Sequence, residues 1–135
     1  MTVSAAVTDQ RGWMKITVTG VASTDSAGIG TVANPEGVTL GITRAFVYFR
    51  TGSTGAATFD IGIGALATTN TVIADFAAVI QGTVGGKMYF CPTAQVAVTE
   101  NPITKWLSTT YVTFTSAQST AGLDADVYLE YIHLA

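Results

Sequence analysis

Ionisable side chains are scarce in this sequence, and their scarcity narrows the chemistry that the chain can perform. Only 11% of its 135 residues are charged, against about 25% in an average globular protein. The chain has six lysines and arginines, nine acidic residues and a net charge of −3. It therefore lacks the basic surface that binding to a phosphate backbone requires, and we expect no nucleic-acid partner.

Histidine and cysteine occur once each, as His133 and Cys91. A zinc site built from the usual ligand sets needs several such side chains, so none is expected. A single cysteine excludes an internal disulfide framework and is consistent with folding in a reducing cytosol. Cys91 lies in an apolar stretch without a basic neighbour, which predicts a buried, unreactive thiol. His133 is expected to be an ordinary residue of a strand end or an interface.

The sequence offers no converging set of catalytic groups, so it predicts neither an enzyme nor a cofactor. Glycines in residues 28–33 and 62–67 match the outline of a dinucleotide fingerprint, but neither segment follows a strand and opens a helix. Asp124 and Asp126 lack the ligand loop of a calcium site and are expected to be a solvated strand edge.

Long apolar runs are also missing. The longest, from Ile73 to Ile80, is interrupted by Asp75 and is too short to span a bilayer. Residues 1–13 lack a cationic start followed by an apolar run. We therefore expect neither a membrane span nor a cleavable signal.

β-Branched residues are abundant instead. Threonine, valine and isoleucine dominate over leucine, and these side chains fit a pleated sheet better than a helix. The 14 glycines are spread along the chain, which is typical of many short strands separated by turns. The sequence predicts an all-β fold, a jelly-roll-like antiparallel β-sandwich. We expect an N-terminal arm over residues 1–13 and a single β-sandwich domain over residues 14–135.

Alternating patterns predict seven strands, over residues 14–21, 42–51, 57–64, 87–91, 94–99, 109–116 and 124–134. The second and third of these are joined by the glycine-rich segment 52–56, which indicates a hairpin. Residues 22–41 read as a long surface excursion with a turn at 34–37. Apolar residues at helical spacing predict one short helix over residues 71–81, ended by Gly82.

Two of the predicted strands carry large side chains on both faces. In the strand over 42–51, one face holds Ala45, Val47 and Phe49, and the other holds the set Ile42, Arg44, Phe46, Tyr48 and Arg50. In the strand over 124–134 both faces are apolar. One holds Val127, Leu129 and Tyr131, and the other holds Tyr128, Ile132 and Leu134. Aromatic and arginine side chains together are typical of interface cores. The residues Arg44, Phe46, Tyr48, Arg50, Tyr128 and Ile132 therefore form a candidate interface with other subunits or with a capsid. The alternative is an outer face on which arginine stems cover aromatic rings.

Two tryptophans offer a different interpretation. Trp13 or Trp106, if exposed on a β-sandwich, would stack on sugar rings. A tryptophan in a domain of this size is more often an anchor in a core or an interface.

Three stretches carry a resemblance to a known family: residues 34–37 (NPEG), 53–64 (STGAATFDIGIG) and the tail from Ala121 to Ile132. Across roughly residues 30–134 the chain resembles the small head-associated capsid cement, or decoration, proteins of tailed bacteriophages. The resemblance implies a β-sandwich or jelly roll that forms a homotrimer on the outer capsid surface and bridges capsomers of the major capsid protein. It implies a virion protein made in the host cytoplasm, without catalytic residues.

Two functions follow from these observations. The first is a virion structural protein that stabilises a phage head. The alternative is a carbohydrate-binding or adhesion module of the head-fibre or receptor-binding type.

Overall fold

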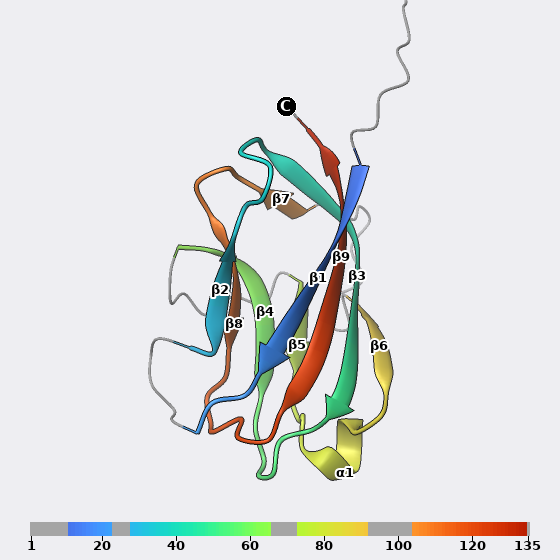
Figure 1. The fold of residues 1–135 in the computed structure, drawn as a ribbon. Coiled ribbons are helices and arrows are strands. Elements are labelled where there is room, and N and C mark those ends of the chain that lie inside the picture. The colour runs from blue at the N-terminus through green and yellow to red at the C-terminus, as the bar shows by residue number, and fades with distance from the viewer. Residues whose placement is uncertain (1–10, 23–27, 66–72, 92–103, 135) are drawn as a thin grey trace, which may run out of the picture.

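The fold consists of two antiparallel sheets that pack face to face around an apolar core (Figure 1). The computed structural model describes residues 11–22, 28–65, 73–91 and 104–134. The larger sheet contains β1 (Arg11–Thr19), β3 (Leu40–Thr51), β6 (Met88–Cys91), β7 (Thr104–Trp106) and β9 (Asp124–His133). The smaller sheet contains β2 (Gly30–Ala33), β4 (Phe59–Gly64), β5 (Ala74–Phe76) and β8 (Tyr111–Thr115). A single helical turn, α1 (Gln81–Val84), precedes β6.

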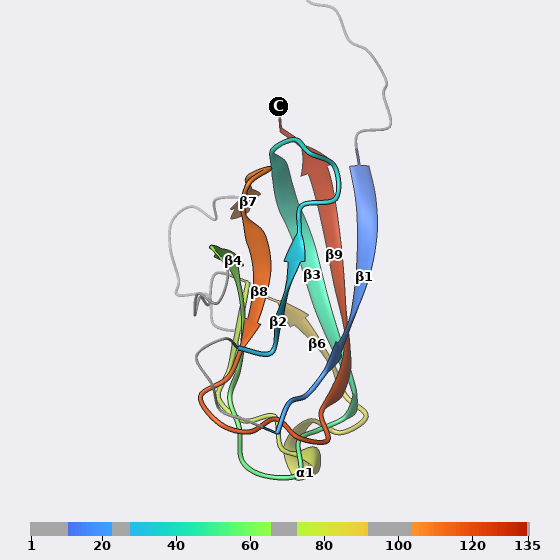
Figure 2. The same cartoon turned by 60° about the vertical axis from the view of Figure 1, so that its left-hand side comes forward.

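The strand order is that of a jelly roll. It runs β1-β9-β3-β6 in one sheet and β2-β8-β4-β5 in the other, and the short β7 also pairs with β3. The chain pairs with itself in reverse order, β1 with β9, β2 with β8, β3 with β6 and β4 with β5. This is one long hairpin rolled into two layers, which lie side by side in Figure 2. The predicted all-β sandwich is confirmed.

Alternation along the strands creates the core. In β9 the side chains of Val127 and Leu129 are fully buried. The two sheets meet through aromatic rings. Phe49 of β3 lies edge-on to Phe59 of β4 at 6.0 Å between ring centroids, and Phe59 stacks on Phe114 of β8 at 6.1 Å. Such contacts add to the stabilisation that the buried apolar area provides.

The predicted hairpin between residues 42–51 and 57–64 is wrong, because β3 and β4 belong to different sheets. The segment between them crosses the sandwich, where the backbone N–H of Ser53 donates to the carbonyl of Val79 at 2.8 Å. A glycine-rich connection between two alternating runs suits a hairpin and a crossing equally well. The pairing of β4 with β5 supplies the hairpin instead.

The predicted helix over residues 71–81 is also displaced. Within that range Ala74–Phe76 forms strand β5, and the helical turn begins only at Gln81. Ala74 and Phe76 are buried while Asp75 between them is exposed, which is the alternation of a strand. Over so few residues the spacing of apolar side chains fits both a helix and a strand, and hydrogen bonding to β4 stabilises the strand.

Residues 22–41 contain more structure than the predicted surface excursion, because β2 and the start of β3 lie within them. The predicted turn at 34–37 is present. The Oδ1 atom of Asn34 accepts hydrogen bonds from the backbone N–H groups of Glu36 at 2.9 Å and Gly37 at 3.1 Å. Gly37 has φ +71°, a conformation that favours glycine.

Strand β1 begins at Arg11, so the last three residues of the expected arm belong to the sheet. Residues 1–10 and the strand predicted over 94–99 lie outside the described residues. Within the part of the chain that the structure describes, no helix is long and apolar enough to cross a membrane.

Candidate interaction interface

The outer face of the larger sheet carries a continuous group of large apolar side chains. Cross-strand register sets Phe46 of β3 between Tyr128 of β9 and Phe90 of β6. In the next row Tyr48 stands beside Met88. Trp13 of β1 completes the group. We call this set the aromatic face; it comprises Trp13, Phe46, Tyr48, Met88, Phe90 and Tyr128.

Much of the aromatic face is exposed to solvent. Trp13 is 53% exposed, Met88 60% and Phe90 59%. The rings also order one another, since Trp13 stacks on Phe46 at 6.1 Å between centroids and Phe90 lies edge-on to Phe46 at 5.1 Å. An open apolar depression of about 240 Å³ lies among Trp13, Phe46, Met88 and Tyr128. A preformed apolar surface of this kind is typical of interaction sites.

Ion pairs flank the aromatic face. On one side the Nε atom of Arg44 lies 3.2 Å from the Oε1 atom of Glu130, which also accepts a hydrogen bond from the Thr43 hydroxyl at 2.7 Å. On the other side the guanidinium of Arg50 donates to both Asp124 and Asp126.

The Arg50 cluster holds its carboxylates in the charged form. Hydrogen bonds from Arg50 lower the pKa of Asp124 and that of Asp126, and the two carboxylates in turn raise the pKa of Arg50. Asp126 also accepts a hydrogen bond from the hydroxyl of Thr17 at 3.1 Å and lies 3.8 Å from the ammonium of Lys15. Lys15, Arg44 and Arg50 are therefore each matched by carboxylates of the same subunit.

The structure brings the residues of the predicted interface onto this one face. They are Arg44, Phe46, Tyr48, Arg50, Tyr128 and Ile132, and all project from the outer side of β3 and β9. Ile42, which the alternation assigns to the same face, lies in the core at 8% exposure. The register shift between Ile42 and Arg44 inserts Thr43 as a bulge and turns Ile42 inward.

Met88 and Phe90 are not among the interface residues predicted from the sequence. The signal was present, because the segment 87–91 alternates these two residues with Tyr89 and Cys91. Both sets are apolar, so the pattern does not show which one is buried. The structure buries Cys91, packs Tyr89 against the core, and leaves Met88 and Phe90 exposed.

Trp106 cannot stack on a sugar, and that interpretation is wrong. Its side chain is fully buried, and its Nε1 atom donates to the carbonyl of Thr110 at 3.0 Å. On β7 it alternates with the exposed Lys105, so its ring turns into the core. Trp13 remains accessible as part of the aromatic face.

The remaining candidates for chemistry are engaged or buried. Burial raises the pKa of the Cys91 thiol to about 12, so the thiolate that nucleophilic chemistry needs is disfavoured. The Nε2 atom of His133 lies 3.9 Å from a carboxylate oxygen of Glu36, which also accepts a hydrogen bond from the hydroxyl of Tyr131 at 2.9 Å. Among the residues that the structure describes, no group of three or more histidine, cysteine or acidic side chains could hold a metal ion.

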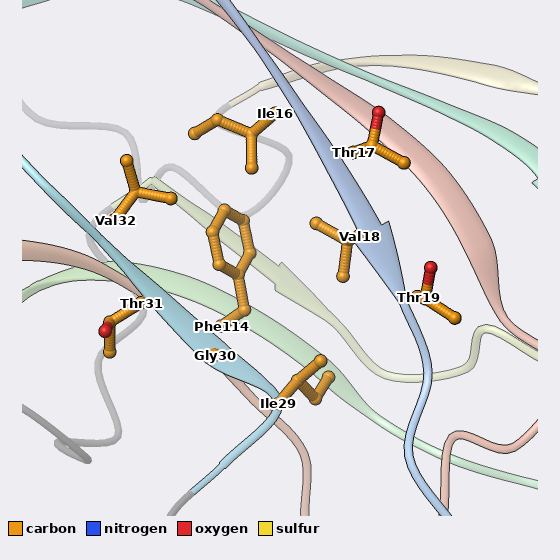
Figure 3. Close-up of a pocket in the computed structure, with 9 residues that line it drawn as sticks. All are labelled: Ile16, Thr17, Val18, Thr19, Ile29, Gly30, Thr31, Val32 and Phe114. Carbon is orange, nitrogen blue, oxygen red and sulfur yellow. The ribbon is translucent and has the colours of Figure 1, made fainter.

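A second, smaller groove of about 120 Å³ lies between the edge strands β1 and β2. Figure 3 shows Ile16 and Val18 pointing toward Phe114, whereas Thr17 and Thr19 point away. The groove is the open side of the sandwich. Its lining combines core side chains such as Phe114 with exposed threonines and contains no charged group.

Comparison with known proteins supports the fold. No protein-family model matches the chain, and no curated protein does. Among solved structures, a chain from the capsid of Ralstonia phage GP4 is similar, with a TM-score of 0.57 and 18% sequence identity over 100% of this chain and 92% of that one. The two chains share a fold over nearly their whole lengths.

Proposed function

We propose that this chain is a structural protein of a bacteriophage virion that binds the outer surface of the head and stabilises it as a cement protein. The aromatic face carries the proposal, because it is a large, preordered apolar surface whose neighbouring charges are already matched. The fold shared with a phage capsid chain adds support. In this role the chain forms a homotrimer and contacts the major capsid protein.

Interfaces of this kind gain stability from many contacts and not from one pocket. A standard interface buries about 1,600 Å² in total, and aromatic side chains supply most of the binding energy at its centre. Trp13, Phe46 and Phe90 form such a centre, and the flanking pairs of Arg44 and Arg50 correspond to the polar rim.

The test is a measurement of mass in solution by light scattering, followed by mixing with phage heads stripped of accessory proteins. The wild-type chain is expected to sediment with the heads and to raise the temperature at which they break open. The double variant Trp13→Ser, Phe90→Ser should bind at least tenfold more weakly, because each truncated anchor removes roughly 1–2 kcal/mol.

Both substituted side chains are more than half exposed, so the variant should fold normally. Leu107→Ser is the matched control, since Leu107 is also apolar and 47% exposed but lies in the turn between β7 and β8. Equal binding by the double variant and the wild type would remove the aromatic face from the interface.

A carbohydrate-binding role is the second candidate, because Trp13 is exposed beside Phe46 and Tyr128. Sugar stacking would quench the fluorescence of Trp13 on titration with glycans, and Trp13→Phe would remove the signal. Cement function predicts affinity for heads and no such quenching.

A further inference from the structure

Two carboxylates stand directly opposite each other on the outer side of the smaller sheet. Asp60 of β4 and Asp75 of β5 are cross-strand partners, while their neighbours Phe59 and Phe76 point into the core. Cross-strand partners have Cβ atoms about 4.5–5.5 Å apart, and like charges in this position repel. Two ionised carboxylates in this position therefore destabilise the sheet unless a positive charge compensates them.

No basic side chain supplies that charge in the described part of the chain. The ion pairs formed there by lysine, arginine and histidine involve Asp124, Asp126, Glu130 and Glu36, and neither Asp60 nor Asp75. Burial, a hydrogen bond with Asp75 and the repulsion from Asp75 together raise the pKa of Asp60 to about 6. Ionisation of Asp60 beside Asp75 therefore costs free energy.

A third oxygen-bearing side chain extends the same row. Thr115 of β8 is the cross-strand partner of Asp60 on the side opposite Asp75. Thr115 is only 5% exposed, and its hydroxyl oxygen, like that of Thr113 two residues before it, has no hydrogen-bond partner among the described residues. A buried hydroxyl without a partner is uncommon and calls for an explanation by a ligand or an ordered water.

We propose that Asp60, Asp75 and Thr115 bind a hard divalent cation of the calcium class on the outer side of the smaller sheet. Two carboxylates and a hydroxyl provide up to five oxygen ligands, and water completes the six to eight that Ca²⁺ takes. The cation neutralises the repelling pair and engages the unpartnered hydroxyl. Asp124 and Asp126 are a poor site by comparison, since Arg50 already neutralises them.

The experiment is isothermal titration of the chelator-treated full chain with CaCl₂ at pH 7.5, with MgCl₂ as a parallel arm. A site with few protein ligands should have a Kd on the order of 0.1–1 mM for Ca²⁺. At about ten times Kd the melting temperature should rise by about 3–6 °C, because the cation binds only the folded chain.

Asp60→Asn and Asp75→Asn should each abolish the rise in melting temperature, and Thr115→Val should weaken binding roughly tenfold. Glu36→Gln, which removes a carboxylate from the turn at 34–37, is the control and should respond as the wild type does. The absence of Ca²⁺ heat and of a melting-temperature rise up to 10 mM would overturn the proposal. So would an equal rise in all variants, which indicates unspecific binding. If Asp60→Asn fails to fold, the proposal is tested by comparing Ca²⁺ binding of the wild type with that of Asp75→Asn.

Discussion

At the scale of single residues, the two tryptophans show how far local sequence context determines a role. Trp13 lies between Gly12 and Met14, and Trp106 lies between Lys105 and Leu107. These neighbours do not distinguish them, yet Trp106 is fully buried and Trp13 is 53% exposed. The difference depends on which side of the strand faces the second sheet. That side is fixed by partners distant in the sequence, such as the pairing of Leu40 with Trp106.

Arg50 is the residue whose removal should have the clearest pH signature. Its hydrogen bonds hold the pKa of Asp124 and Asp126 below the ordinary value of 3.8, so the stabilisation is complete above that value and is lost as the pH falls below it. Arg50→Gln should therefore lower the melting temperature at pH 7, and the difference from wild type should shrink between about pH 4 and pH 2. Thermal unfolding followed by circular dichroism across this range measures it.

Lys105→Gln serves as the control for Arg50→Gln, because Lys105 is exposed on β7 and should show no such convergence. If the difference in melting temperature between wild type and Arg50→Gln stays constant down to pH 2, the assigned role of the Arg50 cluster is wrong.

At the scale of elements, strands with one polar face could be predicted and their partners could not. The alternation of β1 fixes its buried side, because Ile16 and Val18 recur at a period of two between polar residues. β9 is apolar on both faces, so its pattern predicts a strand without showing which face is buried. The bulge at Thr43 and the short β5 cannot be predicted from the alternation of apolar residues, because each depends on pairing with a neighbouring strand. For the same reason the candidate interface could be predicted on β3 and β9, but its extension onto β6 could not.

The chain directly after β1 packs closely against the segment that precedes β9, and this contact can be tested. The N–H of Gly20 donates to the carbonyl of Leu123 at 2.8 Å, and a Cβ at this position would lie 1.8 Å from the carbonyl oxygen of Thr120. Gly20→Ala should lower the free energy of unfolding by about 1–3 kcal/mol, because the backbone must shift. Urea denaturation measures the change.

Gly55→Ala is the matched control for Gly20→Ala, since a Cβ at Gly55 meets no atom within 4 Å. It should be neutral or slightly stabilising, because alanine restricts the unfolded chain. Equal effects of the two substitutions would show that the contact between Gly20 and Thr120 is not tight.

At the scale of the whole molecule, the two outer surfaces differ in kind. One sheet presents the aromatic face, flanked by the ion pairs of Arg44 and Arg50. The other carries the carboxylate pair of Asp60 and Asp75, which no described basic side chain matches, beside the buried Thr115. The first surface suits an apolar partner and the second a cation. The low charge and high threonine content of the sequence predict that the protein acts through contact surfaces and not through reactive groups. Composition cannot show which surface lies on which sheet.

This division predicts how association through the aromatic face responds to salt. Because Lys15, Arg44 and Arg50 are paired within the subunit, burial of apolar area is expected to be the main driving force for association. The affinity for heads and for other copies should change less than about threefold between 0.05 and 0.5 M NaCl, a range over which screening abolishes long-range attraction. Sedimentation at several salt concentrations measures this. A steep loss of affinity with salt would mean that unpaired charges carry the contact.

The pairing of the first strand with the last sets the order of events during synthesis. β9 pairs with both β1 and β3, so β1 cannot join the larger sheet until the ribosome has synthesised residues 124–133. Most contacts in this topology join distant parts of the chain, which makes folding slow. The apolar residues of the core therefore stay exposed in each nascent chain until β9 has been made. A chain truncated within β9 should remain unfolded, bind chaperones and be degraded by proteases.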